Sequence, residues 1–319
     1  MLGPGITIFG VSRVYLKVMK FKVQETNSGQ RLDEVILDRA KNSESQFSEI
    51  NRSQIKKLIS GGFAKLNDEV VTKSGTKLKN GDSVQLELPQ PKLIEFDLPI
   101  IFEDENTVVY NKPSGMLTHA KGGFTAENTL SLVLEPKTTD LGGERTGIVH
   151  RLDRDTSGVI ICAKNPEAKS YLMRQFSERR TKKTYLAVVE GVPKLSTAKL
   201  DWPIGRNPKN PSFFRVSPEG KPAQTIYQVI SSTNNLSLVK LNPITGRTHQ
   251  LRVHMLHLNH PIIGDRFYNV DSKIKSPRLM LHALSLEITI PGGIRKVFRA
   301  DPPPEFLDFL SEHTLSLED

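Results

Sequence analysis

Strand-forming patterns dominate the last two thirds of this chain, and only a few helices separate them. Short runs rich in β-branched and aromatic residues recur after residue 100, with turn-forming residues between them. Two segments have helical periodicity instead: one begins at Pro166 behind a capping Asn165 and ends near residue 180, and the other covers 248–259. Clustered strands with occasional helices are typical of an α+β domain with a mixed, largely antiparallel sheet. The expected strands are 107–110, 158–163, 184–190, 224–231, 236–241 and 281–290.

The first ninety residues predict a separate, smaller α/β domain. Helical periodicity covers 31–40 and 52–60, and the second helix ends at a Gly-Gly pair. Short strands follow, up to residue 88. Three prolines between 89 and 99 indicate a linker to the larger domain.

The extreme amino terminus does not fit either domain. Residues 1–18 lack the basic region and the cleavage site of a signal peptide, and Met19 is a plausible start of translation. We therefore expect residues 1–18 to be a disordered or mis-assigned extension. The expected domain boundaries are 1–18, 19–88, 89–99 and 100–319.

Charge and cysteine content limit the partners and the compartment. The net charge is +9, and between Arg145 and Thr184 ten lysines and arginines stand against four acids. Clustered cations attract phosphate, so RNA is the expected partner. The single Cys162 rules out an internal disulfide and fits a reducing compartment. No apolar run approaches the ~20 residues of a membrane span, so we expect a protein that does not enter a membrane. We also expect it to be cytoplasmic and monomeric.

One carboxylate, Asp153, lies in a segment suited to reaction chemistry. The segment 148–159 reads Ile-Val-His-Arg-Leu-Asp-Arg-Asp-Thr-Ser-Gly-Val, so Arg151 and Arg154 flank the acid. Nearby cations favour the ionised form of a carboxyl group. An ionised carboxylate on a loop beside a strand can act as a nucleophile or as a base. A salt-bridged turn is the alternative interpretation of the same residues.

Two further segments supply candidate partners for Asp153. Tyr185 opens a strand directly after a basic cluster, where it could pack as an ordinary strand residue, stack on a nucleobase or transfer a proton. Arg252 lies on the helix that follows Gly246, and an arginine there is a suitable partner for a distant carboxylate. The sequence therefore predicts that Arg252 pairs with Asp153.

Four histidines between residues 249 and 260 raise the alternative of a metal-dependent hydrolase. No glutamate accompanies them in the His-Glu-x-x-His pattern, and Asp265 is the one acid nearby. The sequence also contains no phosphate-binding Gly-x-x-x-x-Gly-Lys-Ser/Thr loop, no Gly-x-Gly-x-x-Gly after a strand and no Gly-x-Ser-x-Gly elbow. We therefore expect neither a metal nor a cofactor.

Taken together, these separated motifs resemble those of the RluA-type pseudouridine synthase family. The resemblance covers about residues 111–287, and several motifs in the same order are far more specific than any one of them. Departures are minor: Arg154 stands where lysine is common, and Ala120 where proline is common. The segments that carry the resemblance are 111–119, 147–158, 183–191, 246–254, 261–265 and 281–283.

The resemblance implies roles for four of these residues. Asp153 matches the family's essential aspartate, Tyr185 its active-site tyrosine, and Arg252 the basic residue that pairs with the aspartate. Arg151 matches the arginine that helps to displace the target base. The implied reaction converts uridine to pseudouridine without a cofactor. The aspartate acts at the anomeric carbon, either by covalent attack or through a glycal-type intermediate, and the sequence does not choose between these.

The smaller domain resembles the RNA-binding module of ribosomal protein S-four. The resemblance lies in Arg31-Leu32-Asp33 and in the segments 52–59 and 78–82. In that family the basic second helix binds the RNA backbone, and here no acid falls between residues 50 and 67, which predicts an unbroken basic face. A solvated helical domain without RNA contacts is the alternative. Over the whole chain, the residues expected to contact RNA are Arg52, Lys56, Lys57, Arg151, Arg247 and His249.

The combined expectation is a pseudouridine synthase that modifies structured RNA, specifically large-subunit (23S) ribosomal RNA or a pre-ribosomal particle. A synthase that modifies tRNA is the alternative in substrate. A non-catalytic RNA-binding or ribosome-assembly factor on the same fold is the alternative in class. That factor would be expected to lack at least one of Asp153, Tyr185 and Arg252, and all three are present.

Overall fold

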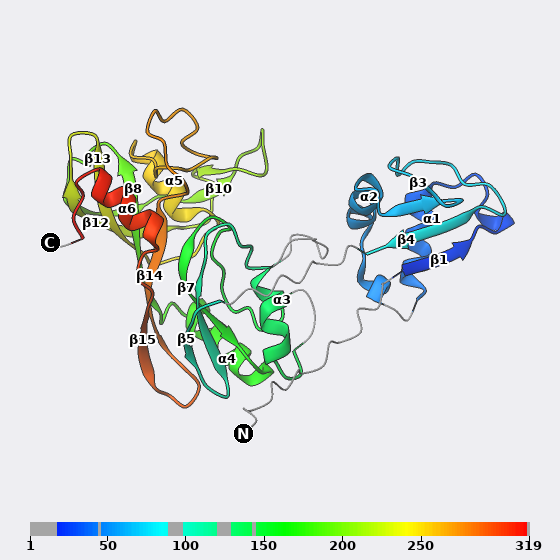
Figure 1. The fold of residues 1–319 in the computed structure, drawn as a ribbon, viewed down its shortest axis with the longest axis horizontal. Helices are drawn as coiled ribbons and strands as arrows, with labels where there is room; N and C mark the ends of the chain where they lie inside the picture. The colour runs from blue at the N-terminus through cyan, green and yellow to red at the C-terminus, as the bar shows by residue number, and fades with distance from the viewer. Residues whose placement is uncertain (1–17, 44–45, 89–97, 120–128, 142–144, 318–319) are drawn as a thin grey trace, which may run out of the picture. The chain divides into compact units, whose positions relative to one another are not determined.

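The computed structural model describes residues 18–43, 46–88, 98–119, 129–141 and 145–317. These residues form two compact units, a smaller one up to residue 88 and a larger one from residue 98 onward (Figure 1). Within the described ranges, no helix combines the length and the apolar character needed to cross a bilayer.

The smaller unit is a four-stranded antiparallel sheet packed against two helices. Helix α2 begins with a capping box, in which Asn51 and Gln54 exchange side-chain and backbone hydrogen bonds. The apolar faces of both helices pack on the sheet, with Leu32, Ile36 and Ile55 fully buried. In sheet order the strands are β1 (Val18–Lys22), β4 (Ser83–Glu87), β2 (Ala64–Leu66) and β3 (Glu69–Val70), and the helices are η1 (Glu25–Asn27), α1 (Leu32–Lys41), η2 (Gln46–Glu49) and α2 (Arg52–Ser60).

The start of the smaller unit differs from the expected boundary by one residue. Val18 belongs to β1 and pairs with Glu87, so assigning it to a disordered extension was wrong. The strand has five residues, and three of them are at intermediate exposure. Its sequence therefore shows no clear alternation of buried and exposed side chains. The rest of that expected extension, residues 1–17, and most of the expected linker, residues 89–97, lie outside the described residues.

The larger unit is built on a nine-stranded sheet. Every pair of neighbouring strands is antiparallel except β7 and β14, which run parallel. The prediction of a mixed, largely antiparallel sheet in an α+β fold is therefore confirmed. The order is β5 (Ile100–Glu103), β6 (Thr107–Lys112), β7 (Ser157–Ala163), β14 (Leu281–Thr289), β8 (Lys182–Glu190), β13 (Leu236–Pro243), β12 (Gln224–Ser232) and β9 (Thr197–Asp201), with β15 (Arg295–Arg299) paired to β14.

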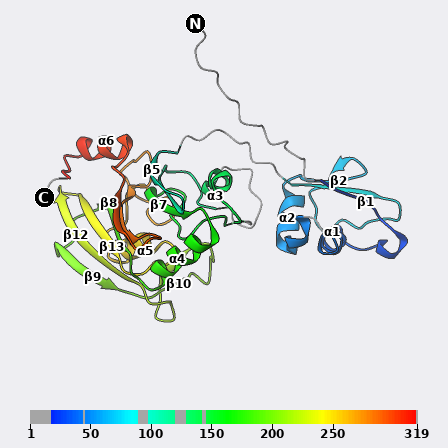
Figure 2. The ribbon, with the colours of Figure 1, turned by 90° about the horizontal axis from the view of Figure 1, so that it is seen from below.

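Helices cover both faces of this sheet. The strand β7 is buried along its whole length because its side chains alternate between two cores: Ile160 packs with α3 and Val159 with α4 (Figure 2). The other helices, α5 and α6, pack on β8 and β13 at the other end of the sheet. The remaining elements are α3 (Leu130–Leu134), η3 (Glu135–Lys137), α4 (Pro166–Ser177), β10 (Ile204–Arg206), β11 (Phe214–Val216), α5 (Gln250–His257) and α6 (Pro304–Glu312).

Gly158 allows β7 and β14 to run side by side. Its φ is +113°, and a Cβ there would lie 2.2 Å from the carbonyl oxygen of Ala283 on β14.

Gly158→Ala should therefore lower the free energy of unfolding by about 2–4 kcal/mol, because it adds backbone strain and a clash with the backbone of β14. Urea denaturation measures this. Gly293→Ala is the matched control, since Gly293 also has a positive φ but nothing lies within 4 Å of its Cβ position. Equal losses in the two variants would contradict the explanation.

Candidate active site

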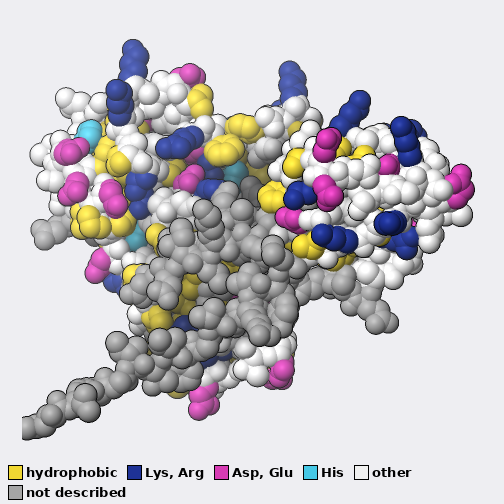
Figure 3. Space-filling model, turned by 45° about the vertical axis from the view of Figure 1, so that its right-hand side comes forward, with side chains coloured by type: hydrophobic (Ala, Val, Ile, Leu, Met, Phe, Trp, Pro, Cys, Tyr) yellow, Lys and Arg dark blue, Asp and Glu magenta, His cyan; other side chains and the backbone are white. Residues whose placement is uncertain are grey.

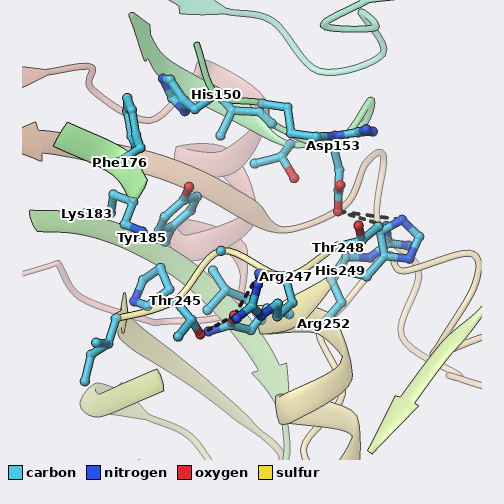
Figure 4. Close-up of a pocket in the computed structure, with 18 of the residues that line it drawn as sticks. His150, Asp153, Phe176, Lys183, Tyr185, Thr245, Arg247, Thr248, His249 and Arg252 are labelled. Carbon is cyan, nitrogen blue, oxygen red and sulfur yellow. Dashed lines mark hydrogen bonds and ion pairs between the residues drawn. The ribbon is translucent and has the colours of Figure 1, made fainter. Parts of the chain in front are cut away.

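A pocket of about 500 Å³ opens beside the loop that precedes β7. Three stretches line it: the loop before β7, the end of α4 with the start of β8, and the loop before α5. Figure 4 shows Tyr185 and Lys183 on one side of the pocket, and Asp153, His249 and Arg252 on the other. The fold therefore brings together the three residues that the sequence motifs singled out, although they are up to 99 positions apart.

The loop that carries Asp153 is fastened to residues 112–118. Lys112 is fully buried, and its ammonium donates hydrogen bonds to three backbone carbonyl oxygens, one of them in the Asp153 loop. Burial lowers the pKa of Lys112 to about 7. These contacts fix the backbone on both sides of Asp153. They are Lys112 Nζ to Arg154 O (3.1 Å), Ser114 Oγ to Asp155 O (2.8 Å), Thr118 Oγ1 to Leu152 O (2.8 Å) and Gly115 N to Arg154 O (2.9 Å).

Arg252 links Asp153 to a second carboxylate, Asp265. Its Nη1 donates to Asp153 Oδ2 at 3.3 Å, which confirms the predicted pairing. Its Nε and Nη2 donate to the two oxygens of Asp265 at 2.7 Å each, in the bidentate geometry that arginine favours. Arg252 is 4% exposed and Asp265 1%. The buried cation is therefore held by Asp265 and presented to Asp153.

The surroundings of Arg252 keep it charged. Burial alone would lower its pKa, but the hydrogen bonds and charge of Asp265 outweigh burial, and the pKa is raised. The guanidinium also lies over the rings of Phe267 and Tyr268, at 5.3 and 5.1 Å from their centroids. Asp265 Oδ1 in turn accepts hydrogen bonds from the backbone N–H groups of Phe267 and Tyr268. Residues 265–268, in the loop after α5, thus supply both the second carboxylate and the two aromatic rings that contact Arg252.

Tyr185 and Lys183 face the pocket from the same side of β8, two residues apart. Burial, with a smaller effect of the Asp153 charge, raises the pKa of the Tyr185 hydroxyl, so the phenol stays neutral near pH 7. Burial lowers the pKa of the Lys183 ammonium to about 8. The pocket thus has an aromatic ring and a cation on one wall and an ion-paired carboxylate on the other.

Comparison with known proteins assigns a family to this arrangement. A family model described as RNA pseudouridylate synthase matches residues 106–257. A protein of Aquifex aeolicus named as an uncharacterized RNA pseudouridine synthase is 37% identical, over 93% of this chain and 98% of its own length. The chain belongs to the RNA pseudouridine synthase family. The expected family and enzyme class, an isomerase that converts uridine to pseudouridine, are thereby confirmed.

Further pseudouridine synthases agree in sequence and in fold. A protein of Borreliella burgdorferi named ribosomal large subunit pseudouridine synthase D is 39% identical over 79% of this chain and 87% of its own length. One of Vibrio cholerae with the same name is 33% identical, with 93% and 94% covered. The solved structure of human RNA pseudouridylate synthase domain containing 4 is 28% identical, with a TM-score of 0.56, and matches 69% of this chain and 95% of its own.

Among the described residues of this synthase, no ion pair joins Asp153 to either of the arginines that flank it. The ion pair of Asp153 comes from across the fold, from Arg252, and Nε2 of His249 lies 3.9 Å from the same carboxylate oxygen. Arg151 and Arg154 are exposed, and the side chain of Arg151 lines the pocket.

The four histidines of the metal alternative point in different directions. His254 contacts Thr225 Oγ1 and Trp202 O, His257 packs edge-on against Trp202, and His260 contacts Glu190 O. Only His249 reaches the pocket, where Nδ1 is 2.8 Å from the hydroxyl of Tyr268. Over the described residues, no cluster of three metal-ligating side chains occurs.

In the smaller unit, the predicted basic face of α2 is partly neutralised. Arg52 donates to Asp33 and Glu34 of α1, at 2.9 and 2.7 Å, and Lys56 lies 3.8 Å from Asp33. On the face drawn in Figure 3, lysines and arginines of this unit alternate with acids. The prediction of an unbroken basic face was wrong because the acids come from another helix. Lys57 is exposed, with no ion pair among the described residues.

Three functional residues escaped the sequence reasoning. Lys112 and Asp265 lay within the motifs, but Lys112 was given no role and Asp265 was considered only as a metal ligand. Tyr268 was not considered. The need for a second counter-charge such as Asp265 follows only from the burial of Arg252, which the spacing of residues along the chain does not reveal.

Proposed function

We propose that this synthase modifies uridines of large-subunit ribosomal RNA, with Asp153 as the group that acts on the sugar. The observation that carries the assignment of Asp153 is its 3.3 Å contact with Arg252, in a pocket that Tyr185 also lines. Relatives named ribosomal large subunit pseudouridine synthase C and D, at 33% and 39% identity over most of the chain, support the choice of substrate.

The reaction needs a carboxylate but no oxidant or phosphate donor. The bond between N1 of uracil and C1′ of the sugar breaks, the base turns, a bond forms between C5 and C1′, the proton on C5 is lost, and N1 takes up a proton. Asp153 either attacks C1′ or removes the C2′ proton to give a glycal. Tyr185 stacks on the flipped uracil, and its neutral hydroxyl can assist the loss of the C5 proton. Arg252 orients Asp153 through its hydrogen bond to Oδ2.

The target uridine must leave the helical stack before any of this can occur, at a cost of a few kcal/mol. Arg151 is exposed at the rim of the pocket and two residues from Asp153, so its side chain can fill the gap that the base leaves. Arg247 and His249 also line the pocket, from which they can contact the backbone of the RNA.

The smaller unit, residues 18–88, binds RNA through α2 in this proposal. Its support is the likeness to the module of ribosomal protein S-four and the exposed cations of the helix. Asp33 and Glu34 already pair with Arg52, and Asp33 also lies near the ammonium of Lys56. Lys57 is therefore the cation of this helix that is best able to bind a phosphate.

Replacing Lys56 and Lys57 with glutamine should weaken RNA binding and lower the slope of log affinity against log salt by about one for each phosphate that is no longer neutralised. The single variant Lys57→Gln should account for more of the change than Lys56→Gln. Filter binding at a series of salt concentrations measures both. As a control, Lys296→Gln on β15 removes one positive charge, as each of the two single variants does. An unchanged slope in the double variant would mean that α2 does not contact RNA.

The substrate is tested by mapping pseudouridine chemically in RNA from cells with and without this gene. Loss of pseudouridine from 23S ribosomal RNA alone is expected. Loss from tRNA instead would show that tRNA is the substrate. Comparing the activity of the purified enzyme on free 23S RNA with its activity on pre-ribosomal particles would identify the form of the RNA on which it acts.

We further propose that the protein is a cytoplasmic monomer. The buried, unreactive Cys162 fits a reducing compartment, and light scattering tests the monomeric state.

A further inference from the structure

His249 lies between Asp153 and Tyr268, where it can act on the carboxylate as well as on the RNA. Its Nε2 is 3.9 Å from Asp153 Oδ2, and its Nδ1 is 2.8 Å from the hydroxyl oxygen of Tyr268. The hydroxyl oxygen also accepts a hydrogen bond from the backbone N–H of Phe214, at 3.0 Å. A continuous chain of polar contacts therefore runs from β11 through Tyr268 and His249 to the carboxylate.

The directions of these hydrogen bonds follow from the donors present. Because the N–H of Phe214 donates to the oxygen of Tyr268, the hydroxyl hydrogen must go to another acceptor. Among the described residues, the acceptor within reach is Nδ1 of His249. A neutral imidazole that accepts at Nδ1 carries its hydrogen on Nε2. The hydrogen on Nε2 then points toward Asp153.

The position of the His249 ring is also constrained. His249 is the residue before α5 and has a left-handed φ of +55°, so its side chain leaves the helix in a direction that a helical residue would not take. Phe214, Phe267 and Tyr268 surround the ring, with centroids 5.6, 6.1 and 5.6 Å away. Its side chain is 14% exposed. A ring held in this way loses little entropy when it donates to a substrate-bound carboxylate.

Both contacts of Asp153 fall on the same oxygen. Arg252 Nη1 lies 3.3 Å from Oδ2, and His249 Nε2 lies 3.9 Å from Oδ2. Among the described residues, no side chain forms a hydrogen bond or an ion pair with Oδ1. The distance to His249 is longer than a hydrogen bond, but such contacts are often long in the absence of substrate and shorten in the reacting complex.

We propose that Tyr268 fixes the Nε2–H form of His249, and that His249 and Arg252 together hold Oδ2 of Asp153 so that Oδ1 is the oxygen that reacts with the sugar. His249 and Tyr268 are positioning residues: they act on the RNA through Asp153. The inference rests on the proposed role of Asp153.

The test compares Tyr268→Phe, His249→Phe and the double variant by single-turnover rate at saturating RNA, with the dissociation constant measured separately. Tyr268→Phe should lower the rate roughly 3- to 10-fold, the effect of removing one orienting hydrogen bond, with an unchanged dissociation constant. In the His249→Phe background, adding Tyr268→Phe should not lower the single-turnover rate further. Tyr227→Phe is the control, because Tyr227 is a buried tyrosine that donates to Leu195 O away from the pocket, and its replacement should not change the rate.

His249→Gln and a pH series separate a positioning role from a purely structural one. Glutamine places an N–H donor near the position of Nε2 and should recover part of the rate that His249→Phe loses. An imidazolium donates from both nitrogens whatever Tyr268 does. The deficit of Tyr268→Phe should therefore shrink as the pH falls from about 8.5 to about 5.5, across the range in which histidines titrate. Among the described residues, an ion-pair distance joins His249 to Asp153, which Arg252 also contacts, and the raised pKa of the Tyr268 phenol keeps it neutral throughout.

Two outcomes would overturn the inference. One is a full effect of Tyr268→Phe in the His249→Phe background, and the other is a loss that appears only in the dissociation constant. A failure of the proposed function itself would look different, because an active Asp153→Asn variant would remove Asp153 from the reaction whatever the His249 variants do.

Discussion

Asp153→Asn should abolish pseudouridine formation, with a fall in rate of roughly four orders of magnitude or more, as removal of an essential reacting group costs in other enzymes. Asparagine keeps the shape of the side chain but loses the charge and the nucleophilic or basic oxygen. Release of tritium from RNA labelled at carbon 5 of uridine measures the reaction directly, because the C5 proton must leave.

The same substitution should leave the fold and RNA binding nearly unchanged. The backbone of the loop is held by Lys112, Ser114 and Thr118, and none of these contacts uses the side chain of Asp153. Arg252 keeps its two bonds to Asp265 and can still donate to the asparagine oxygen. Thermal melting and filter binding are the controls. Tritium release at the wild-type rate would remove Asp153 from the proposed chemistry.

Arg252→Met should eliminate activity and also lower the free energy of unfolding by about 3–5 kcal/mol, since it leaves a buried carboxylate without its cation. The carboxylate is that of Asp265, whose side chain is 0% exposed. Two backbone N–H groups would still donate to Asp265, so the variant should fold with reduced stability. Urea denaturation and tritium release measure the two effects.

A second variant separates the two effects of this substitution. Arg252→Met combined with Asp265→Leu removes both charges of the buried pair, and replacing a whole buried pair by apolar residues is often neutral for stability. The double variant should therefore recover stability but not activity, because Asp153 still lacks its cation. Recovery of activity together with stability would mean that Arg252 supports the fold and has no part in the reaction.

Local sequence signals predicted the elements that are bounded by strong local contacts. Helix α2 was expected at 52–60 and lies at Arg52–Ser60, because Asn51 and Gln54 form its capping box and two glycines end it. Helix α5 was expected at 248–259 and is shorter, Gln250–His257, because His249 takes a left-handed conformation outside the helix. Helix α6 (Pro304–Glu312) was not predicted; its N-cap is Pro303, which forms no side-chain cap, and its first residue is Pro304.

The strands that were missed lie at the edges or in hairpins. They are short and expose many of their side chains, so the alternation of apolar and polar residues is weak. Some of them pair with strands far along the chain, as β1 does with β4 and β9 with β12, while β15 forms a hairpin with β14. These strands are β1, β5, β9, β10, β11 and β15.

The amino-acid sequence by itself determined the family, the α+β class and the identity of the three residues at the centre of the pocket. Motifs such as Arg-Leu-Asp around Asp153 are local, so they can be read without a fold. The sequence also predicted that Arg252 pairs with Asp153, but only the tertiary structure showed which other charges meet. Arg252 also pairs with Asp265, and the cations of α2 meet acids of α1. Electrostatic energy depends on distance in space and on burial, and neither follows from spacing along the chain.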